Sequence, residues 1–389
     1  MQEFKYKKEF AAPIKAVFYG DFDIDLCQLA VVLNSRQTKT PCGNDPWVAG
    51  TLKAIQRAIS QNLTLLTSTG MNTWELACWA GGIYGGSQIV IYPILENDKI
   101  DQIVTDFSHD FNLDPARTGW LFFEATEKAR TPKIDWPVRD RLAIQFAKTI
   151  LPISLRPGGN LEELVNSSKN SRIIEDFRVK YKESNHHENI KLDNIKVSVP
   201  RKNWDYVTHW TRTCHGPWPK ESSASFFECL IGSADKYHHD GPATLKHIIK
   251  EKKMRASSNN FREGIAAVAF SSLHPEDILP LMRWRKRYVR WNFEPYGIAI
   301  SRKAAAKTGI RPVIYGKPEL YKMLVDSDKP YFQSEGVDGG DWREENEWRF
   351  IGDYDLSIIE PEDMVIIVYQ PFEIAALREQ TDSKILSFI

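Results

Sequence analysis

The N-terminal half of the chain alternates short apolar runs with helical patterns, and this alternation limits the fold more than any other feature. The apolar runs cover residues 27–33, 63–67 and 88–92, and each has the length of a buried strand. Helical patterns cover residues 47–60 and 73–80 between them. Because strands and helices that alternate in this way indicate βαβ units, we expect an α/β domain with a Rossmann-like parallel sheet.

Three polar loops follow predicted strands in this half, at residues 34–36, 68–71 and 156–159. In parallel sheets, ligands bind beyond the carboxyl ends of the strands, where loops and helix N-termini present free N–H groups. Each loop has a small residue, and two carry an arginine suited to phosphate. Any one loop alone is better explained as an ordinary turn, but the three together predict a nucleotide or phosphate site.

Two common nucleotide-binding motifs are missing from the sequence. Neither the GxGxxG fingerprint of dinucleotide-binding proteins nor the P-loop of NTPases occurs. Ordinary dinucleotide oxidoreductases and NTPases are therefore disfavoured.

The order of the N-terminal motifs is similar to that of the superfamily of DNA-processing protein A and the Lonely Guy phosphoribohydrolases, known as SLOG. The resemblance covers residues 26–165 and rests on the three loops and on the Arg-Asp-Arg segment 139–141, which opens a predicted helix. It implies a nucleotide-derived small molecule as ligand. It also implies binding roles for the residues that match its motifs: Ser35, Arg36, Ser68, Gly70, Arg139, Gly158 and Gly159.

The last glycine loop departs from the pattern of the hydrolytic members. Those members carry PGGxGT followed by a glutamate, whereas residues 160–163 here read Asn-Leu-Glu-Glu after the glycine pair. The departure disfavours phosphoribohydrolase activity and favours ligand sensing. A nucleotide hydrolase acting at this site is kept as an alternative.

The chain is long enough for two domains. Its 389 residues exceed the roughly 250–300 at which one hydrophobic core stops growing. Residues 166–200 are polar, mixed in charge and ended by a proline, so we predict a linker there, between a domain at 1–165 and a second one at 201–389. Short strands with irregular helices in the second domain predict an α+β fold.

The C-terminal half is rich in aromatic residues and arginines. Its side chains suited to chemistry are His209, Arg212, Ser271, Ser272, Tyr296, Glu344 and Glu347. A histidine or arginine on an early strand, hydroxyls on a middle strand, a tyrosine and a late glutamate resemble the ADP-ribosyltransferases, particularly DarT-type enzymes. The segments 270–271, 296–298, 311–315 and 345–349 also resemble a series found in phage-resistance (AbiG-like) proteins, over residues 204–370.

This second resemblance implies an enzyme that uses NAD as substrate. Cleavage of the nicotinamide–ribose bond passes through an oxocarbenium-like state, which a nearby carboxylate stabilises. The resemblance assigns that role to Glu347, with His209, Ser271 and Tyr296 as further catalytic residues and Arg212 as an NAD-binding residue. Two purely structural alternatives stay open. Glu347 pairs with Arg349 beneath Trp348, and His209 is a core histidine.

Five basic residues crowd the stretch 283–290. They are typical of a site for a phosphate-bearing macromolecule, but a solvated helix face explains them equally well. The acceptor of any ADP-ribose, nucleic acid or protein, is left open, and so is homo-oligomer formation.

Composition excludes several classes. The 51 basic and 51 acidic residues give no global attraction to nucleic acid or to an anionic membrane. No apolar run reaches the roughly 18–20 residues of a membrane span, and the start is charged rather than signal-like. The five cysteines are odd in number and widely spaced, without a CxxC pair. These features predict a cytoplasmic protein with no metal site.

Taken with the two resemblances, the sequence predicts a bacterial anti-phage defence or toxin-like effector. Its N-terminal domain would sense a nucleotide and control a C-terminal NAD-using ADP-ribosyltransferase or NAD hydrolase. The alternative from another class is a non-enzymatic signal-binding protein whose C-terminal domain contacts a partner.

Overall fold

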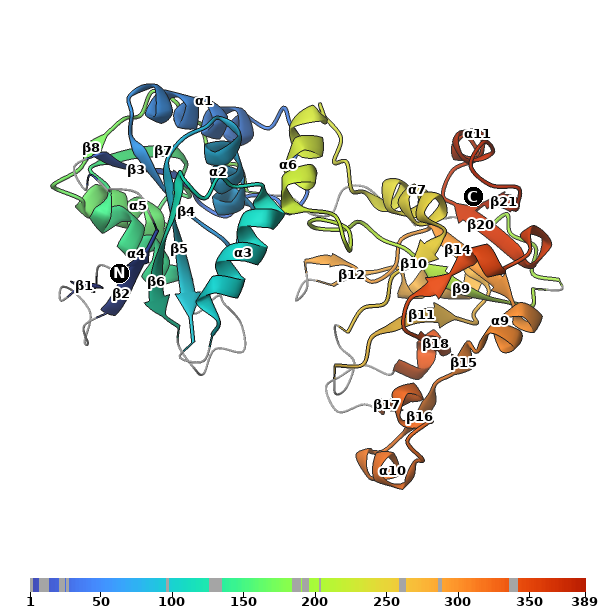
Figure 1. Cartoon of the computed structure of the whole chain (residues 1–389). Coiled ribbons are helices and arrows are strands. Elements are labelled where there is room, and N and C mark those ends of the chain that lie inside the picture. The colour runs from blue at the N-terminus through green and yellow to red at the C-terminus, as the bar shows by residue number, and fades with distance from the viewer. Residues whose placement is uncertain are drawn as a thin grey trace. The chain divides into compact units, whose positions relative to one another are not determined.

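The computed structural model covers 389 residues and groups them into two compact units (Figure 1). The first unit comprises residues 1–185 and 215–238, and the second comprises residues 186–214 and 239–389. The structure describes every residue of the chain except 1–2, 7–13, 21–24, 26–27, 96–97, 126–134, 184–189, 191–195, 203, 259–263, 286–288 and 336–341. Cys27, Lys286, Arg287 and much of the predicted linker therefore lie outside the described residues.

An eight-stranded sheet forms the centre of the first unit, in the order β1-β2-β6-β5-β4-β3-β7-β8. The strands from β3 to β8 run parallel to their neighbours, whereas β1 and β2 join the β6 edge in antiparallel fashion. The predicted Rossmann-like parallel sheet is confirmed. The bounds are β1 Glu3–Tyr6, β2 Ile14–Tyr19, β3 Leu29–Asn34, β4 Thr64–Ser68, β5 Gln88–Ile94, β6 Thr118–Glu124, β7 Thr149–Ser154 and β8 Arg172–Ile173.

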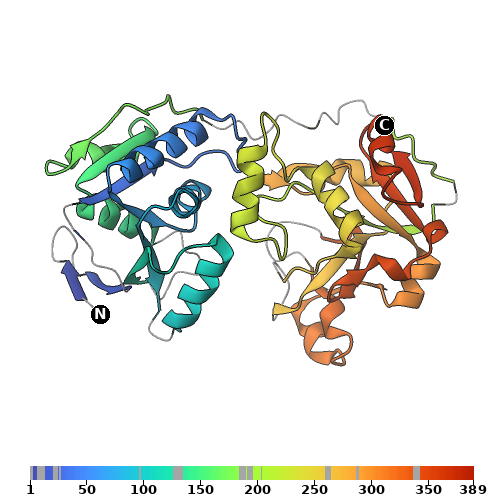
Figure 2. The same ribbon diagram turned by 45° about the horizontal axis from the view of Figure 1, so that its top comes forward.

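Helices cover both faces of this sheet because the strands are apolar on both sides. On β3, Ala30 and Val32 pack with α1, α2 and α3, whereas Val31 and Leu33 pack with α4 and α5 on the opposite face (Figure 2). The bounds are α1 Pro46–Ser60, α2 Asn72–Ile83, α3 Ile100–Phe111, α4 Trp136–Phe146 and α5 Asn160–Ser167.

The strand order reverses next to β3. From β3 the chain builds β4, β5 and β6 outward on one side, and then crosses to place β7 on the other side. In open parallel sheets the crevice at such a reversal, outside the carboxyl ends of the strands, is where ligands bind. The loops after β3 and β7 are therefore where a ligand site is expected.

The contacts within each unit differ from the predicted domain boundaries in two places. Past residue 165, Arg172 and Ile173 add β8 to the sheet beside β7, within the stretch predicted as a linker. Residues 215–238, inside the predicted second domain, belong to the first unit. Their helix α6 (Ser223–Gly232) lies beside α2 and α3 (Figure 1).

A seven-stranded sheet forms the second unit, in the order β15-β18-β11-β9-β14-β20-β21. Most neighbours are antiparallel, and short helices flank the sheet, so the predicted α+β character is confirmed. The sheet strands are β9 Tyr206–Trp210, β11 Ala267–Ser271, β14 Gly297–Ser301, β15 Arg311–Pro312, β18 Glu347–Ile351, β20 Met364–Val368 and β21 Lys384–Ser387.

Smaller elements complete this unit. Its helices are α7 Gly241–Glu251, α8 Pro275–Ile278, α9 Arg302–Thr308, α10 Pro318–Met323 and α11 Glu373–Leu377. Three two-stranded pairs lie outside the main sheet: β10 Lys253–Met254 with β19 Tyr354–Asp355, β12 Trp284–Arg285 with β13 Arg290–Trp291, and β16 Ile314–Gly316 with β17 Phe332–Ser334.

The main sheet is weakly joined at its middle. β9 pairs with β14 over five residues, but with β11 through one residue pair, Ser271 with Thr208. The sheet therefore consists of two halves, β15-β18-β11 and β9-β14-β20-β21, connected at one point.

We expect Phe227→Ala to destabilise the first unit by about 3–5 kcal/mol, the usual cost of deleting a buried phenyl ring. Phe227 is 2% exposed, and its ring stacks on Trp79 with centroids 6.0 Å apart. The measurement is the urea midpoint of the first unit. As control, Phe372→Ala removes a side chain that is 76% exposed and should change stability by less than about 0.5 kcal/mol. Equal midpoints for both variants would show that α6 does not stabilise the first unit.

Candidate functional site

The loops after β3 and β7 are bonded to each other at the reversal of strand order. The Ser35 amide donates to the Ser154 carbonyl at 2.9 Å, and the Arg156 amide donates to the Ser35 hydroxyl oxygen at 2.9 Å. The side chains of Arg36 and Arg156 are exposed beside this junction. Two exposed guanidinium groups therefore lie at the reversal of strand order, where this fold class binds anions.

The glycine loop after β7 leads into α5. Gly158 has a left-handed φ of +64°, and Gly159 precedes the first turn of α5 without a side-chain cap. The Gly158 amide donates to Oε2 of Glu162 at 2.8 Å. The carboxylate of Glu162 thus accepts from an amide that an anionic ligand would use. Glu162 lies in the segment 160–163, where this loop departs from the pattern of the hydrolytic members.

The loop after β4 is held by interior contacts. Ser68 is fully buried, and its hydroxyl donates to the Ile91 carbonyl at 2.6 Å. Gly70 has a φ of +88°, and its amide donates to Oε1 of Glu75 at 3.0 Å. A Cβ at Gly70 would lie 2.9 Å from Nε1 of Trp136, so a side chain does not fit there. Both predicted residues thus determine the shape of the loop.

Arg139 is 2% exposed and fastens this loop to α4. Its guanidinium donates to the Thr69 carbonyl at 2.8 Å and pairs with Asp140 at 2.8 Å. It also lies over the rings of Trp74, at 4.8 Å, and Trp136, at 5.6 Å. Of the predicted residues in this unit, Ser35, Arg36, Gly158 and Gly159 lie in the two loops after β3 and β7, whereas Ser68 and Arg139 are buried.

Trp136 and Glu75 were not predicted as site residues. Two guanidinium groups lie near the Trp136 ring, because Arg36 and Arg139 are each 5.6 Å from its centroid. Burial raises the pKa of Glu75, and the hydrogen bonds from Gly70 and Thr69 and the charge of Arg139 oppose this shift. A tryptophan beside a proline at a helix start was the available signal for Trp136.

Glu75 generates a prediction about pH. Because its pKa in the folded chain is raised, protonated Glu75 favours folding, and this contribution is lost as the pH rises from about 4 through the raised pKa. We expect the free energy of unfolding of wild type, relative to Glu75→Gln, to fall over this range. Urea titrations from pH 4 to pH 8 measure it, with the exposed Glu124 changed to Gln as control. Parallel pH profiles for wild type and Glu75→Gln would contradict the raised pKa.

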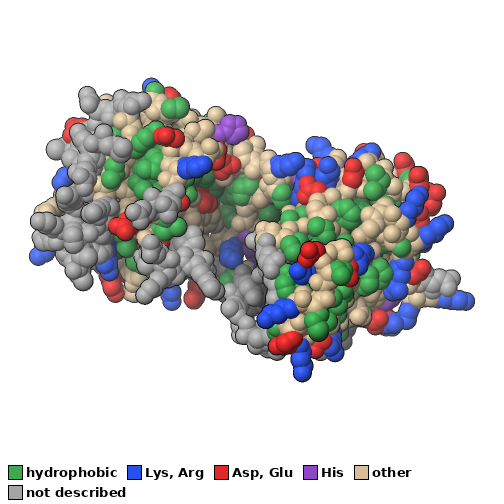
Figure 3. Space-filling view, turned by 60° about the horizontal axis from the view of Figure 1, so that its bottom comes forward, with side chains coloured by type: hydrophobic (Ala, Val, Ile, Leu, Met, Phe, Trp, Pro, Cys, Tyr) green, Lys and Arg blue, Asp and Glu red, His purple; other side chains and the backbone are tan. Residues whose placement is uncertain are grey.

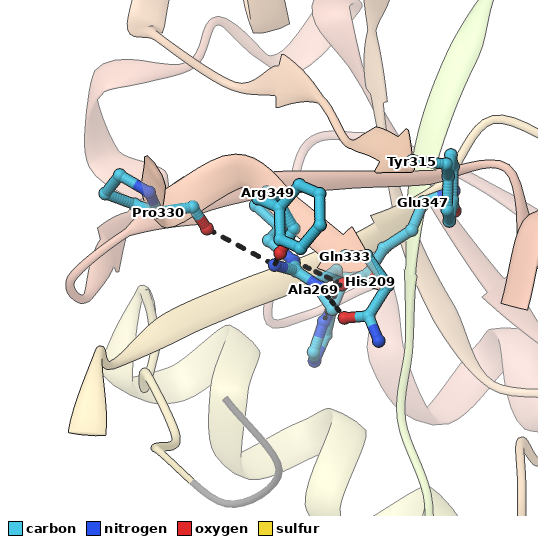
Figure 4. A network of polar contacts seen from close by, with 8 residues as sticks. His209, Ala269, Tyr315, Pro330, Gln333, Glu347 and Arg349 are labelled. Carbon is cyan, nitrogen blue, oxygen red and sulfur yellow. Dashed lines mark hydrogen bonds and ion pairs between the residues drawn. The ribbon is translucent and has the colours of Figure 1, made fainter. Parts of the chain in front are cut away.

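In the second unit, His209 lies where β9 and β11 part. Its ring nitrogen Nδ1 is 2.8 Å from the Ala269 carbonyl oxygen of β11 (Figure 4). A side chain thus bridges the strands just beyond their one backbone pairing at Thr208. Burial lowers the pKa of His209, and the charge of Arg212 lowers it further, which favours a neutral imidazole at pH 7.

Ser271 and Ser272 bind the segment that enters β18. The Ser271 hydroxyl donates to the Glu345 carbonyl at 2.6 Å, and the Ser272 amide donates to the Asn346 carbonyl at 3.1 Å. Ser271 also lies opposite Glu347 in the strand register. The end of β11 therefore fixes the backbone of the segment that carries Glu345 and Glu347.

Glu347 and Arg349 form an ion pair, as the structural alternative predicted. Nε and Nη2 of Arg349 donate to Oε1 and Oε2 of Glu347 at 2.8 and 3.1 Å (Figure 4). The Arg349 side chain is 3% exposed and also donates to the carbonyls of Pro330 and Phe332 and to Gln333. A carboxylate has about four lone-pair sites, so this pairing leaves Glu347 able to accept a further hydrogen bond.

Glu345, which was not predicted, lies two residues before Glu347. Its Oε1 accepts a hydrogen bond from Nδ2 of Asn292 at 3.2 Å, and burial, with the charge of Glu347, raises its pKa. Glu344, which was singled out instead, is exposed. No clear sequence signal marks Glu345, because it ends a short 3-10 helix (Trp342–Glu345) and lies outside the strand that carries Glu347.

Arg212 lies two residues beyond β9. Burial and the charge of Arg290 lower its pKa to about 10. Among the described residues no hydrogen bond or ion pair to Arg212 is formed, since nearby Glu294 accepts instead from the amide and hydroxyl of Thr213, at 2.9 and 3.2 Å. Arg212 is therefore a half-buried cation that, among the described residues, has no hydrogen bond to a carboxylate.

The surroundings of Tyr296 and of the arginine-rich stretch 283–290 differ from those expected from the sequence. The Tyr296 hydroxyl donates to Oε1 of Glu373 at 3.0 Å, and its ring is 7% exposed within an apolar cluster. The stretch 283–290 is not a helix face: its described part forms the β12–β13 pair, with Arg285 opposite Arg290. On the face of the molecule in Figure 3, basic and acidic side chains are interspersed.

The residues that the structure describes lack two kinds of feature. They contain no group of three or more His, Cys, Asp and Glu side chains that could hold a metal ion. Within the same part of the chain, no helix has the length and apolar character needed to cross a membrane.

No family model matches the chain, and no curated protein matches it. Two solved structures are similar to part of it. DNA processing protein A from Helicobacter pylori, described with a single-stranded DNA binding mode, is 10% identical over 43% of this chain and 78% of its own, with a TM-score of 0.31. The Streptococcus pneumoniae protein is 14% identical over 42% and 62%, with a TM-score of 0.25.

Proposed function

We propose that the chain is a two-part effector whose first unit binds a nucleotide-derived ligand and whose second unit cleaves NAD, as an ADP-ribosyltransferase or an NAD hydrolase. The observation that carries the proposal is the parting of β9 from β11 beyond the pair of Ser271 and Thr208. His209, Ser271 and Glu347 lie on three adjacent strands at this break, with Ser271 and Glu347 on one face of the sheet and His209 on the other face by strand register. This chemistry fits the toxin-like or anti-phage role that the sequence resemblance implies.

The reaction uses the carboxylates at this break. The bond between ribose C1′ and the nicotinamide nitrogen breaks, and its electron pair leaves with neutral nicotinamide. The negative charge of Glu347 stabilises the cation that develops on the ribose. Water, or a hydroxyl of an acceptor, bonds to C1′ and gives up a proton. Glu345 is suited to accept that proton because its pKa is raised toward neutrality.

Arg212 supplies the site for the NAD pyrophosphate in this proposal. A half-buried guanidinium without a hydrogen-bonded anion costs stability, and a bound anion would reduce that cost. The charge of Arg290 on Arg212 adds to the positive potential. His209, neutral and fixed by Ala269, would hold the adjoining ribose through its second ring nitrogen.

In the first unit the ligand is a nucleoside phosphate held between the two bonded loops. Arg36 and Arg156 offer exposed guanidinium groups, and the start of α5 offers backbone amides. Because Glu162 already occupies the Gly158 amide, an incoming phosphate would displace it. That competition favours reversible sensing over hydrolysis at this site.

One observation favours the rival class, a second unit that binds a partner without catalysis. Both carboxylate oxygens of Glu347 are engaged by Arg349, as in a purely structural ion pair. Under this rival Glu347 would affect stability alone. The two accounts make opposite predictions for one substitution.

We expect Glu347→Gln to leave the chain folded and able to bind NAD, but to slow NAD consumption by about 10²–10³-fold, because the lost charge acts mainly in the transition state. The measurement is NAD consumption and melting temperature on the same preparation. Glu344→Gln, an exposed neighbour, is the matched control and should keep wild-type turnover. A destabilised Glu347→Gln protein with full activity per folded molecule would favour the rival.

We expect Arg36→Ala to weaken nucleotide binding to the full chain by about 10- to 100-fold, since a charged hydrogen bond to phosphate is lost. Isothermal titration with ADP and with AMP measures the change. Arg57→Ala, an exposed arginine in the last turn of α1, is the control for net charge. If ADP and AMP bind wild type and both arginine variants equally well, the nucleotide lies elsewhere.

A further inference from the structure

The chain passes between the two units three times, after residues 185, 214 and 238. The last two passages lie side by side, because the Cys214 amide donates to the His239 carbonyl at 2.9 Å. Residues 215–238, called the insert below, thus leave the second unit and return to it at one place.

The insert is firmly attached to the first unit. Its helix α6 buries Phe226, Phe227 and Leu230 in the core formed with α1 and α2. At the start of α6, the amide and hydroxyl of Ser223 donate to the two carboxylate oxygens of Asp110 in α3, at 2.9 and 2.6 Å. A movement of the first unit at this point is therefore a movement of the insert.

The loop after β3, residues 35–45 and called the ligand loop below, ends on the insert. Its first residues, Ser35 and Arg36, lie at the reversal of strand order. At its far end, the Gly43 amide donates to the Ser233 carbonyl at 2.9 Å, and the Asn44 amide donates to the Ala234 carbonyl at 3.1 Å. The Asn44 side chain also donates to Asp235 at 3.0 Å.

The contact at Gly43 tolerates no side chain. A Cβ built there would lie 2.2 Å from the Ser233 carbonyl oxygen and 2.7 Å from that of Ile231. Both obstacles are backbone atoms, so the ligand loop or the insert would have to shift. The fit is therefore specific for glycine.

In the second unit, the residues just before the insert include Arg212 of the proposed NAD site, and those just after it begin α7. Before it come Arg212 and Thr213, and Thr213 is held by two hydrogen bonds to Glu294. After it comes Asp240, which caps α7 by accepting from the Ala243 amide at 2.9 Å. The position of Arg212 is thus set two residues from the place where the insert departs.

We propose that the insert transmits ligand binding at the first unit to Arg212 in the second, which makes it the regulatory connection of the effector. This inference rests on the proposed function of the two sites. A ligand that pulls on Ser35 and Arg36 shifts the ligand loop, the loop shifts the insert through Gly43 and Asn44, and the insert repositions Arg212. Coupling of this kind requires that the two states differ in ligand contacts, which the displaceable Glu162 provides.

Gly43→Ala in the full chain tests the connection without any ligand. The control is Gly232→Ala, in the insert itself, where a Cβ meets nothing within 4 Å. Hydrogen–deuterium exchange is followed in the insert, in residues 206–214, and in β20 as a distant reference. We expect Gly43→Ala to speed exchange about fivefold or more both in the insert and in residues 206–214, the effect of losing a hydrogen bond or two. Gly232→Ala and β20 should stay unchanged.

Faster exchange confined to the insert, with residues 206–214 as in wild type, would overturn the proposal. If Gly43→Ala fails to fold, Asn44→Ala removes the bond to Asp235 and is judged by the same comparison. Failure of the proposed function shows separately, as wild type that neither binds ADP nor consumes NAD. The experiments therefore distinguish a chain that transmits the change to residues 206–214 but consumes no NAD from one that consumes NAD without this transmission.

Discussion

The second unit depends on one buried charge, the guanidinium of Arg349. A cation that is 3% exposed costs several kcal/mol unless it is fully paired, so its partners are fixed by necessity. Glu347, Gln333 and the carbonyls of Pro330 and Phe332 provide this pairing, which ties β18 to the segment that enters β17. The carboxylate of Glu347 is consequently held in one orientation beside Ser271, at the break between the two halves of the sheet.

The two units share an arrangement of cations. In each, a buried arginine hydrogen-bonded to carboxylate and carbonyl oxygens shapes the site, and a second arginine has no hydrogen bond to a carboxylate among the described residues. Arg139 and Arg36 have these roles in the first unit, and both lie near the Trp136 ring. Arg349 and Arg212 have them in the second. Because the buried member is already satisfied, an anionic ligand gains most from the other, which is where we place the phosphates of both ligands.

Much of the first unit could be predicted from sequence because it depends on local patterns. Apolar runs and their spacing determine the parallel sheet, and the loops that follow them identify Ser35 and Arg36. Residue type alone does not determine burial, so the same reasoning could not show that Ser68 and Arg139 are buried. Nor could it assign the insert, since the apolar pattern of α6 predicts a buried face without saying which core receives it. In the second unit, Glu345 was missed because the helical or extended state of residues 342–347 had to be known first.

The most direct test of the central claim is where NAD binds on the full chain. Hydrogen–deuterium exchange with and without NAD, on the catalytically slowed Glu347→Gln variant, reports the protected segments. The account predicts slower exchange in residues 206–214 and 345–349, on the two sides of the break in the second sheet. Bound NAD that leaves both segments unprotected, or that protects only the loops after β3 and β7, would contradict it.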